Sequence, residues 1–242
     1  VKAAAFGAFF RLMVSGFGSI QEVWVGTIWM LAVITMTVGN LLALRQTSIK
    51  RMLAYSSIAH AGYALMAFLA TAGSAGAALG GGGALLFYLM GYSLMTVGAF
   101  GVVLIATNNS AAQYDQDDIN SLSGLGWSHP LLGITMVISM LSLAGIPPLA
   151  GFMGKFYIFS AAINAGYVGL AIIAALNSLV SLYYYLRILV VMYFGEKRTQ
   201  TWSPAENIGF GPRLALMLSV LGTIYLGVFS TGFYAVAVEA VK

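Results

Sequence analysis

Apolar runs long enough to cross a lipid bilayer recur along most of this chain. The hydrocarbon core of a bilayer is about 30 Å thick, which a helix of about 20 residues crosses. Of the 242 residues, 60% are hydrophobic and 7% are charged, whereas a soluble domain carries about a quarter charged residues. The composition therefore excludes a soluble enzyme and predicts an all-α, polytopic transmembrane helix bundle.

We expect seven spanning segments in a single transmembrane domain that covers residues 1–242. Their ranges are 1–14, 23–44, 51–71, 83–107, 130–165, 167–194 and 212–236. The first is incomplete, because the chain starts inside an apolar run, so we expect the C-terminal part of a longer protein. A polar stretch, 108–129, separates the fourth and fifth segments, and its tail 119–127 has the pattern of a short interfacial helix.

The fifth segment contains a helix break. As one helix it would run about 54 Å, too long for a core about 30 Å thick. The sequence Gly145-Ile146-Pro147-Pro148 interrupts it, since proline removes a backbone donor and clashes with the preceding turn. We expect two half-helices or a strongly kinked span, which membranes tolerate where it lines a protein or water cavity.

Basic residues gather in the turns on one side of the expected bundle. They are Arg45, Lys50 and Arg51 after the second segment, and Arg187, Lys197, Arg198 and Arg213 around the end of the sixth. The turns on the other side, 15–22, 72–82 and 165–167, hold no Lys or Arg. The positive-inside rule puts the basic turns in the cytoplasm, together with the polar stretch that holds Asp115, Asp117 and Asp118.

Three ionisable side chains fall where the middle of the bilayer should be: Lys2, His60 and Lys155. Nine helical residues, a rise of about 13.5 Å, separate each of them from a residue that marks the membrane edge. The three edge residues are Arg11, Arg51 and Asn164. An ionisable group at that depth is costly and indicates a functional site.

These three side chains suit proton transfer. Loss of water disfavours the charged form of lysine, and histidine titrates near physiological pH with two nitrogens that can receive and pass a proton. Hydroxyl and amide groups in the second, third and sixth segments could bridge them. The candidates are Thr35, Thr37, Asn40, Ser56, Ser57, Tyr63, Asn177, Ser178, Ser181, Tyr183, Tyr184 and Tyr185.

Other interpretations of these residues stay open. Lys2 could extend to the cytoplasmic surface along its own apolar stem. His60 could hold a pair of helices together, and tyrosines 183–185 could pack in the interior or in an interfacial belt. We interpret Lys50, Arg51 and Arg187 as orientation signals. We expect His129 to be interfacial, since it precedes Pro130 at the start of a segment.

The sequence gives no sign of a cofactor or metal site. It has no cysteine, and its two histidines lie far apart. It also lacks a dinucleotide-binding fingerprint and a pair of haem histidines. We therefore expect no cofactor in this chain, no soluble substrate and no nucleic-acid partner, and any energy for transport must come from partner proteins.

Three stretches carry a resemblance to a known family. They are VKAAAFGAFFRL (1–12), QTSIKRMLAYSSIAHAGYALMA (46–67) and LSLAGIPPLAGFMGKFYIF (141–159). The chain resembles the antiporter-like membrane subunits of respiratory complex I, the proton-translocating NADH-quinone oxidoreductase, and among them the subunit N group. The stretches are similar to the family's eighth helix, its tenth helix and its broken twelfth helix. The resemblance therefore implies that this chain supplies helices eight to fourteen of a fourteen-helix subunit.

The resemblance implies a multi-pass, proton-translocating subunit in the inner membrane of a bacterium, in contact with lipids and other membrane subunits of complex I. Lys2 matches the lysine of the central axis, Lys155 the lysine of the second half-channel, and His60 a polar position of the tenth helix. Lys155 favours subunit N or L over subunit M, where a glutamate stands. Flavin, iron–sulfur clusters and quinone are implied in partner subunits, where quinone reduction would drive the transfer.

The resemblance also leaves rival functions open. The family's first half-channel, with a glutamate on helix five and a lysine on helix seven, is expected upstream of Val1, so these residues alone would not form a complete channel. The closest rival is a subunit of a multisubunit cation/proton antiporter, which shares the lysines. A structural membrane scaffold and a stand-alone solute carrier are the others.

Overall fold

The computed structural model describes residues 2–72, 75–108, 117–195 and 209–241, without the side chains of 75–79. Ten α-helices and no strands form there, with short 3-10 or π-helical turns between some of them, which confirms the all-α prediction. The α-helices are α1 (Lys2–Arg11), α2 (Gln21–Leu44), α3 (Ile49–Leu69), α4 (Ala75–Asn108), α5 (Leu125–Ser128), α6 (Pro130–Ala144), α7 (Ala150–Asn164), α8 (Val168–Phe194), α9 (Phe210–Val228) and α10 (Ser230–Glu239).

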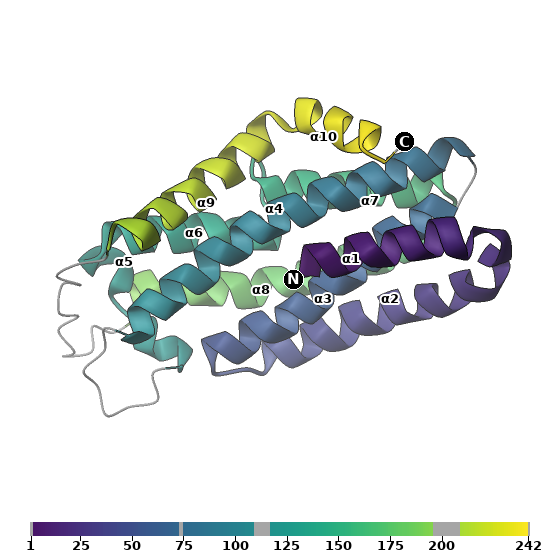
Figure 1. Ribbon diagram of the computed structural model, residues 1–242. Helices are drawn as coiled ribbons and strands as arrows, with labels where there is room; N and C mark the ends of the chain where they lie inside the picture. Colours follow the sequence, from purple (N-terminus) through teal and green to yellow (C-terminus); the bar gives the residue numbers. More distant parts are fainter. Residues whose placement is uncertain (1, 73–74, 109–116, 196–208, 242) are drawn as a thin grey trace.

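The long helices run side by side in an elongated bundle (Figure 1). Five stretches of the described residues are long and apolar enough to cross a membrane: Gly18–Leu44, Ile49–Ala72, Gly80–Thr107, Val168–Phe194 and Phe210–Val228. The other two predicted spans are shorter as single helices. The pair α6–α7 is divided, and α1 has ten residues before a π-helical turn at Leu12–Gly16. The chain is a polytopic helical bundle, as predicted.

One predicted turn, 72–82, is mostly helical. α4 begins at Ala75 and extends over 34 residues, although it includes four consecutive glycines, 80–83. Glycine weakens a helix in water, but in lipid every backbone polar group needs an internal partner, which favours a continuous helix. Gly81 also allows a close crossing of helices, because a Cβ there would lie 2.7 Å from the backbone nitrogen of Thr71. The prediction of a turn was wrong for these reasons.

The break in the fifth segment lies where the sequence predicts it, between α6 and α7. Gly145 has a φ of 91°, a left-handed conformation that favours glycine after a helix end. Its N–H and that of Ile146 both donate to the Leu141 carbonyl oxygen, at 3.1 and 3.0 Å. The Gly151 N–H donates to Ser142 Oγ at 3.0 Å, so the start of α7 is bonded back to the end of α6.

The last predicted span, 212–236, is also divided, and here the prediction of one helix was wrong. Phe229 (φ −107°, ψ 41°) leaves the helical conformation between α9 and α10. Just before it, Gly227 lies against the break of the α6–α7 pair, because a Cβ there would come 2.7 Å from the carbonyl carbon of Leu149. The break between α9 and α10 therefore packs against the break between α6 and α7. Because no proline marks the break at Phe229, the sequence alone did not indicate it.

The bundle has an apolar exterior and an interior rich in buried tyrosine. Leu179 is 66% exposed and Leu221 is 62% exposed, as suits side chains that contact lipid. Four tyrosines are among the largest fully buried side chains: Tyr63, Tyr88, Tyr184 and Tyr185. A buried tyrosine hydroxyl usually has a hydrogen-bond partner, so these residues mark where the polar interior lies.

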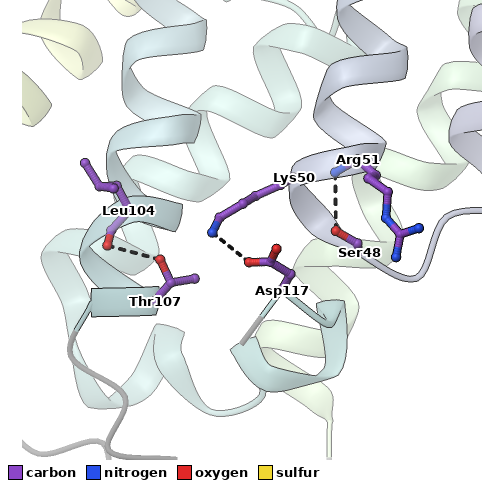
Figure 2. A network of polar contacts seen from close by, with 6 residues as sticks. All are labelled: Ser48, Lys50, Arg51, Leu104, Thr107 and Asp117. Atoms are coloured by element: carbon purple, nitrogen blue, oxygen red, sulfur yellow. Dashed lines mark hydrogen bonds and ion pairs between the residues drawn. The ribbon is translucent and has the colours of Figure 1, made fainter. Parts of the chain in front are cut away.

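The predicted basic end is a cluster of turns (Figure 2). Ser48 begins α3 by accepting the Arg51 N–H on its hydroxyl at 3.3 Å. Lys50 Nζ lies 2.7 Å from a carboxylate oxygen of Asp117. The backbone also joins the two segments, since the Ile49 N–H donates to the Asp117 carbonyl oxygen at 2.7 Å.

Other predictions for this end have mixed outcomes. Arg187, near the end of α8, donates to the Gln46 carbonyl oxygen at 3.3 Å, so the end of α8 and the turn after α2 lie at the same end of the bundle, as predicted. The tail 119–127 is helical in short pieces. Ile119 and Leu122 are each 1% exposed and Trp127 is 66% exposed, so one side of the tail packs into the bundle, and its interfacial position stays a prediction. Lys197, Arg198 and Asp115 lie outside the described residues.

Candidate functional site

Lys155 lies in the second turn of α7, beside the helix break. Its side chain is buried, with 4% of the residue exposed. Nζ donates to the carbonyl oxygens of Leu143 and Ala144 at 3.1 and 3.0 Å, and to Ser178 Oγ at 2.9 Å. An ammonium has three hydrogens to donate, so all three have an oxygen acceptor, and none of these acceptors is a carboxylate.

The helix break creates this site for an amine. The last four carbonyl groups of a helix have no partner within it, and α6 ends with two of them bonded to Lys155. The helix dipole adds about half a negative charge at that end, which favours a cation there. Gly145 leaves the room, because a Cβ at that position would lie 3.2 Å from Lys155 Nζ.

His60 lies in the middle of α3 and is 3% exposed. Its Nδ1 is 2.5 Å from the Tyr88 hydroxyl on α4, and its Nε2 is 3.0 Å from the Tyr185 hydroxyl on α8. The rings of Tyr92 and Tyr63 lie beside the imidazole, with centroids 4.9 and 5.9 Å away. His60 therefore joins three helices, and both of its nitrogens are hydrogen-bonded.

Lys2, on α1, reaches the same region from another side. Nζ donates to the carbonyl oxygen of Ser57 and, at 2.6 Å, to Ser57 Oγ. It also lies 5.1 Å from the centre of the Tyr92 ring. The N-terminal end of α1 is near the middle of the bundle in Figure 1. The bonds to Ser57 hold the amine against α3, so it does not extend along α1 away from the bundle.

Two tyrosine rings connect the three ionisable groups. The ring of Tyr92 contacts both Lys2 and His60. The ring of Tyr63 contacts His60 and lies 5.3 Å from Lys155 Nζ. An aromatic face attracts an ammonium group, so both rings suit their places beside the amines. The structure thus brings all three predicted site residues into one row, with His60 between the lysines.

Four of the predicted bridging residues form a second polar cluster between α2 and α8. Asn40 Nδ2 donates to Asn177 Oδ1 at 3.2 Å, and Asn40 Oδ1 accepts from the Tyr184 hydroxyl at 2.8 Å. Asn177 Nδ2 also donates to Thr37 Oγ1 at 3.3 Å. These bonds run between α2 and α8 and within the cluster, and none of them involves His60 or either amine.

The sequence did not single out Tyr88 and Tyr92, which both face His60. They stand four residues apart on α4, a spacing that puts two side chains on one helix face, and this was a usable signal. The three tyrosines 183–185 have different surroundings: Tyr183 is 65% exposed and so does not pack in the interior, whereas Tyr185 is buried and bonds to His60.

The row lies inside the bundle, since His60 and Lys155 are 3% and 4% exposed. A hollow of about 730 Å³ lies elsewhere, between α1, α4 and the C-terminal residues, with Arg11, Leu85 and Val241 in its lining. Among the described residues, no group of three or more His, Cys, Asp or Glu side chains could hold a metal ion. The chemistry of the row therefore depends on amine, imidazole and hydroxyl groups.

Comparisons with known proteins agree with this architecture. Residues 1–181 match the transmembrane family described as NADH:quinone oxidoreductase/Mrp antiporter. NADH-quinone oxidoreductase subunit N of Trichlorobacter lovleyi is 45% identical over 100% of this chain and 47% of its own length. F(420)H(2) dehydrogenase subunit N of Methanosarcina mazei is 41% identical over 99% of this chain and 48% of its own length. The chain thus spans about half the length of these relatives.

Solved structures share the fold. A chain of respiratory complex I from Thermus thermophilus with bound aureothin is 34% identical, with a TM-score of 0.71 over 87% of this chain and 45% of that one. A chain of the Mrp complex from Dietzia is 19% identical, with a TM-score of 0.80 over 99% of this chain and 50% of that one. The second likeness concerns the fold alone.

Proposed function

This chain belongs to the NADH:quinone oxidoreductase/Mrp antiporter transmembrane family, and on that premise we propose that it is part of a proton-translocating membrane subunit of an NADH-quinone oxidoreductase. Relatives named subunit N of such enzymes match the whole chain at 38 to 45% identity. The Mrp complex shares the fold at 19% identity, so a cation/proton antiporter subunit is the weaker interpretation.

The observation that carries the proposal is the row formed by Lys2, His60 and Lys155. A buried charge that lacks a paired anion is unfavourable, and the contacts of Lys155 are all neutral oxygen atoms. Neutral oxygen atoms stabilise an ammonium less than a carboxylate does, so we propose that Lys155 both takes up and releases a proton. An approaching positive charge would favour loss of its proton.

Proton transfer in this proposal follows the row. A charge change in partner subunits, where quinone is reduced, alters the protonation of Lys2. Lys2 passes its proton toward His60, which accepts on one nitrogen and releases from the other. Lys155 receives the proton and releases it toward the outer side of the membrane. The flavin, iron–sulfur clusters and quinone belong to the partner subunits.

We also propose the surroundings and the orientation of this chain. The chain lies in the inner membrane of a bacterium, in contact with lipids and with other membrane subunits of the enzyme complex. The basic end that contains Lys50, Arg51 and Arg187 faces the cytoplasm, as the positive-inside rule requires.

The test is Lys155→Met in the complete enzyme complex, assayed in sealed membrane vesicles. Methionine fills a similar volume and cannot carry a proton. We expect NADH oxidation to drive fewer protons across the membrane per NADH, with normal assembly. An unchanged ratio would favour a structural scaffold, and co-purification with antiporter subunits in place of NADH-dehydrogenase subunits would favour the rival transporter.

A further inference from the structure

In the two hydrogen bonds of a neutral His60, the imidazole is the donor in one and the acceptor in the other. Both ring nitrogens are bonded, Nδ1 to the Tyr88 hydroxyl and Nε2 to the Tyr185 hydroxyl. A neutral imidazole has one N–H donor and one bare nitrogen acceptor. One tyrosine must therefore donate to His60 while the other accepts from it. Two arrangements satisfy both bonds, and they differ in the sense in which all the hydrogens point.

We propose that Tyr88 and Tyr185 carry the proton into and out of His60, so that the three side chains form a gate that passes one proton at a time. The inference rests on the proposed function, because it describes how a proton crosses between the two amines. It adds two relay residues to the row and a rule for their operation.

The transfer balances in hydrogens. In the starting arrangement Tyr88 donates to Nδ1 and Nε2–H donates to Tyr185. A proton from a lysine amine, directly or through water, binds the Tyr88 oxygen, and Tyr88 passes its original proton to Nδ1. Nε2 then gives its proton to the Tyr185 oxygen, and Tyr185 releases its own original proton onward. Four bonds to hydrogen form and four break, counting those at the external donor and acceptor.

The transfer reverses the donor and acceptor in both hydrogen bonds of His60. Afterwards Nδ1–H donates to Tyr88, and Tyr185 donates to Nε2. A second proton cannot enter from the Tyr88 side, because Nδ1 already holds one. The gate opens again only after His60 has exchanged its proton by another route, which requires a break in at least one tyrosine bond. The same argument holds for transfer in the opposite sense, with the two tyrosines exchanged.

The surroundings of the gate suit this role. Tyr88 and Tyr185 are 2% and 0% exposed, so bulk water does not compete for their hydroxyl groups. The amines of Lys2 and Lys155 flank it through the rings of Tyr92 and Tyr63. A cation therefore stands on either side of the imidazole, and neither amine contacts it directly.

Three consecutive tyrosines supply matched variants. Tyr185→Phe removes the hydroxyl that bonds His60 Nε2. Tyr184→Phe removes an equally buried hydroxyl on the same helix, one that bonds to Asn40. Tyr183→Phe alters an exposed side chain on the outer face. The loss of a buried hydroxyl can therefore be separated from the loss of this particular bond.

The experiment measures protons moved per NADH oxidised by the complete complex in sealed vesicles, for Tyr88→Phe, Tyr185→Phe, the double variant and His60→Gln. We expect both single variants to fall to the ratio of His60→Gln and the double variant to fall no further, because either change interrupts the same path. Tyr183→Phe should match the unaltered complex. The amount of assembled complex is measured in each case, and Tyr184→Phe controls for the loss of a buried hydroxyl.

The outcomes distinguish failure of the tyrosine gate from failure of the proposed proton-translocating function. If His60→Gln and Lys155→Met lower the ratio while both tyrosine variants pump normally, the gate is wrong and the proton-translocating row stands. If the tyrosine losses add in the double variant, or if Tyr184→Phe loses as much as Tyr185→Phe, the hydroxyl groups are structural. If none of these changes lowers the ratio, the proposed function itself fails.

Discussion

Lys50 and Lys155 are both held by oxygen atoms, yet their sites differ in every other respect. Lys50 is 46% exposed at the basic end and pairs with the carboxylate of Asp117 (Figure 2). Lys155 is buried and has two backbone carbonyls and one hydroxyl as partners. The two lysines therefore differ in the charge of their partners and in their access to water. Because burial among neutral acceptors disfavours the charged form of an amine, Lys155 is the lysine for which we propose proton exchange.

Ser178→Asp should give the largest effect, because it makes the site of Lys155 resemble that of Lys50. Two unit charges about 4 Å apart attract by about 4 kcal/mol at an effective dielectric constant of 20. This attraction stabilises the ammonium of Lys155, so proton release would become less favourable. We expect proton pumping by this subunit to stop while the complex still assembles. Proton flux in sealed vesicles measures the pumping.

Ser178→Ala is the matched control for that change. It removes one of three acceptors and leaves the two carbonyl oxygens of α6 in place, so pumping should fall only slightly. If the alanine and aspartate variants pump equally poorly, the hydroxyl itself carries the proton, and the contrast between neutral and charged partners is not what matters.

Lys2→Ala should have the next largest effect. It removes the amine at the other end of the row, whose bonds go to Ser57 and whose ring contact is Tyr92. We expect fewer protons per NADH with normal NADH oxidation, and a smaller change for Ser57→Ala, since the backbone carbonyl of Ser57 remains. A Lys2→Ala complex that pumps normally would remove Lys2 from the row and leave Lys155 to act without it.

Gly145→Ala should perturb stability more than chemistry. An L-residue in the left-handed region costs about 1–2 kcal/mol, and the new Cβ would lie 3.2 Å from Lys155 Nζ. We expect a lower thermal midpoint for the purified complex and a partial loss of pumping. Gly166→Ala, also at positive φ but with nothing within 4 Å of its Cβ, should lower the midpoint alone. Equal pumping losses in both variants would mean that contact with the amine is irrelevant.

The same contrast explains what sequence could predict. Depth along a helix follows from counting residues, so Lys155 and His60 could be found from apolar runs and their edges. The break at Gly145 was equally readable, because proline and glycine act locally. Tyr88 was not found: its spacing from Tyr92 indicates a shared helix face, but its contact with His60 depends on the packing of α4 against α3. The division after Val228 was missed for a similar reason, since it depends on contact with another break.

Lys50→Ala should have the smallest effect, and it tests the exposed half of the comparison. The pair with Asp117 is 46% and 37% exposed on its two sides, and exposed ion pairs contribute about 0–1 kcal/mol. The backbone bond from Ile49 to Asp117 remains, so the turns stay joined. We expect an unchanged number of protons pumped per NADH. We also expect a small shift in thermal midpoint, which is smaller still at high salt, where exposed charges are screened.

Asp117→Asn should have the same effects as Lys50→Ala, because it removes the other partner of the same ion pair. A clear loss of pumping in both variants would mean that proton entry passes through the basic end, and that an exposed, paired lysine also takes part in transfer.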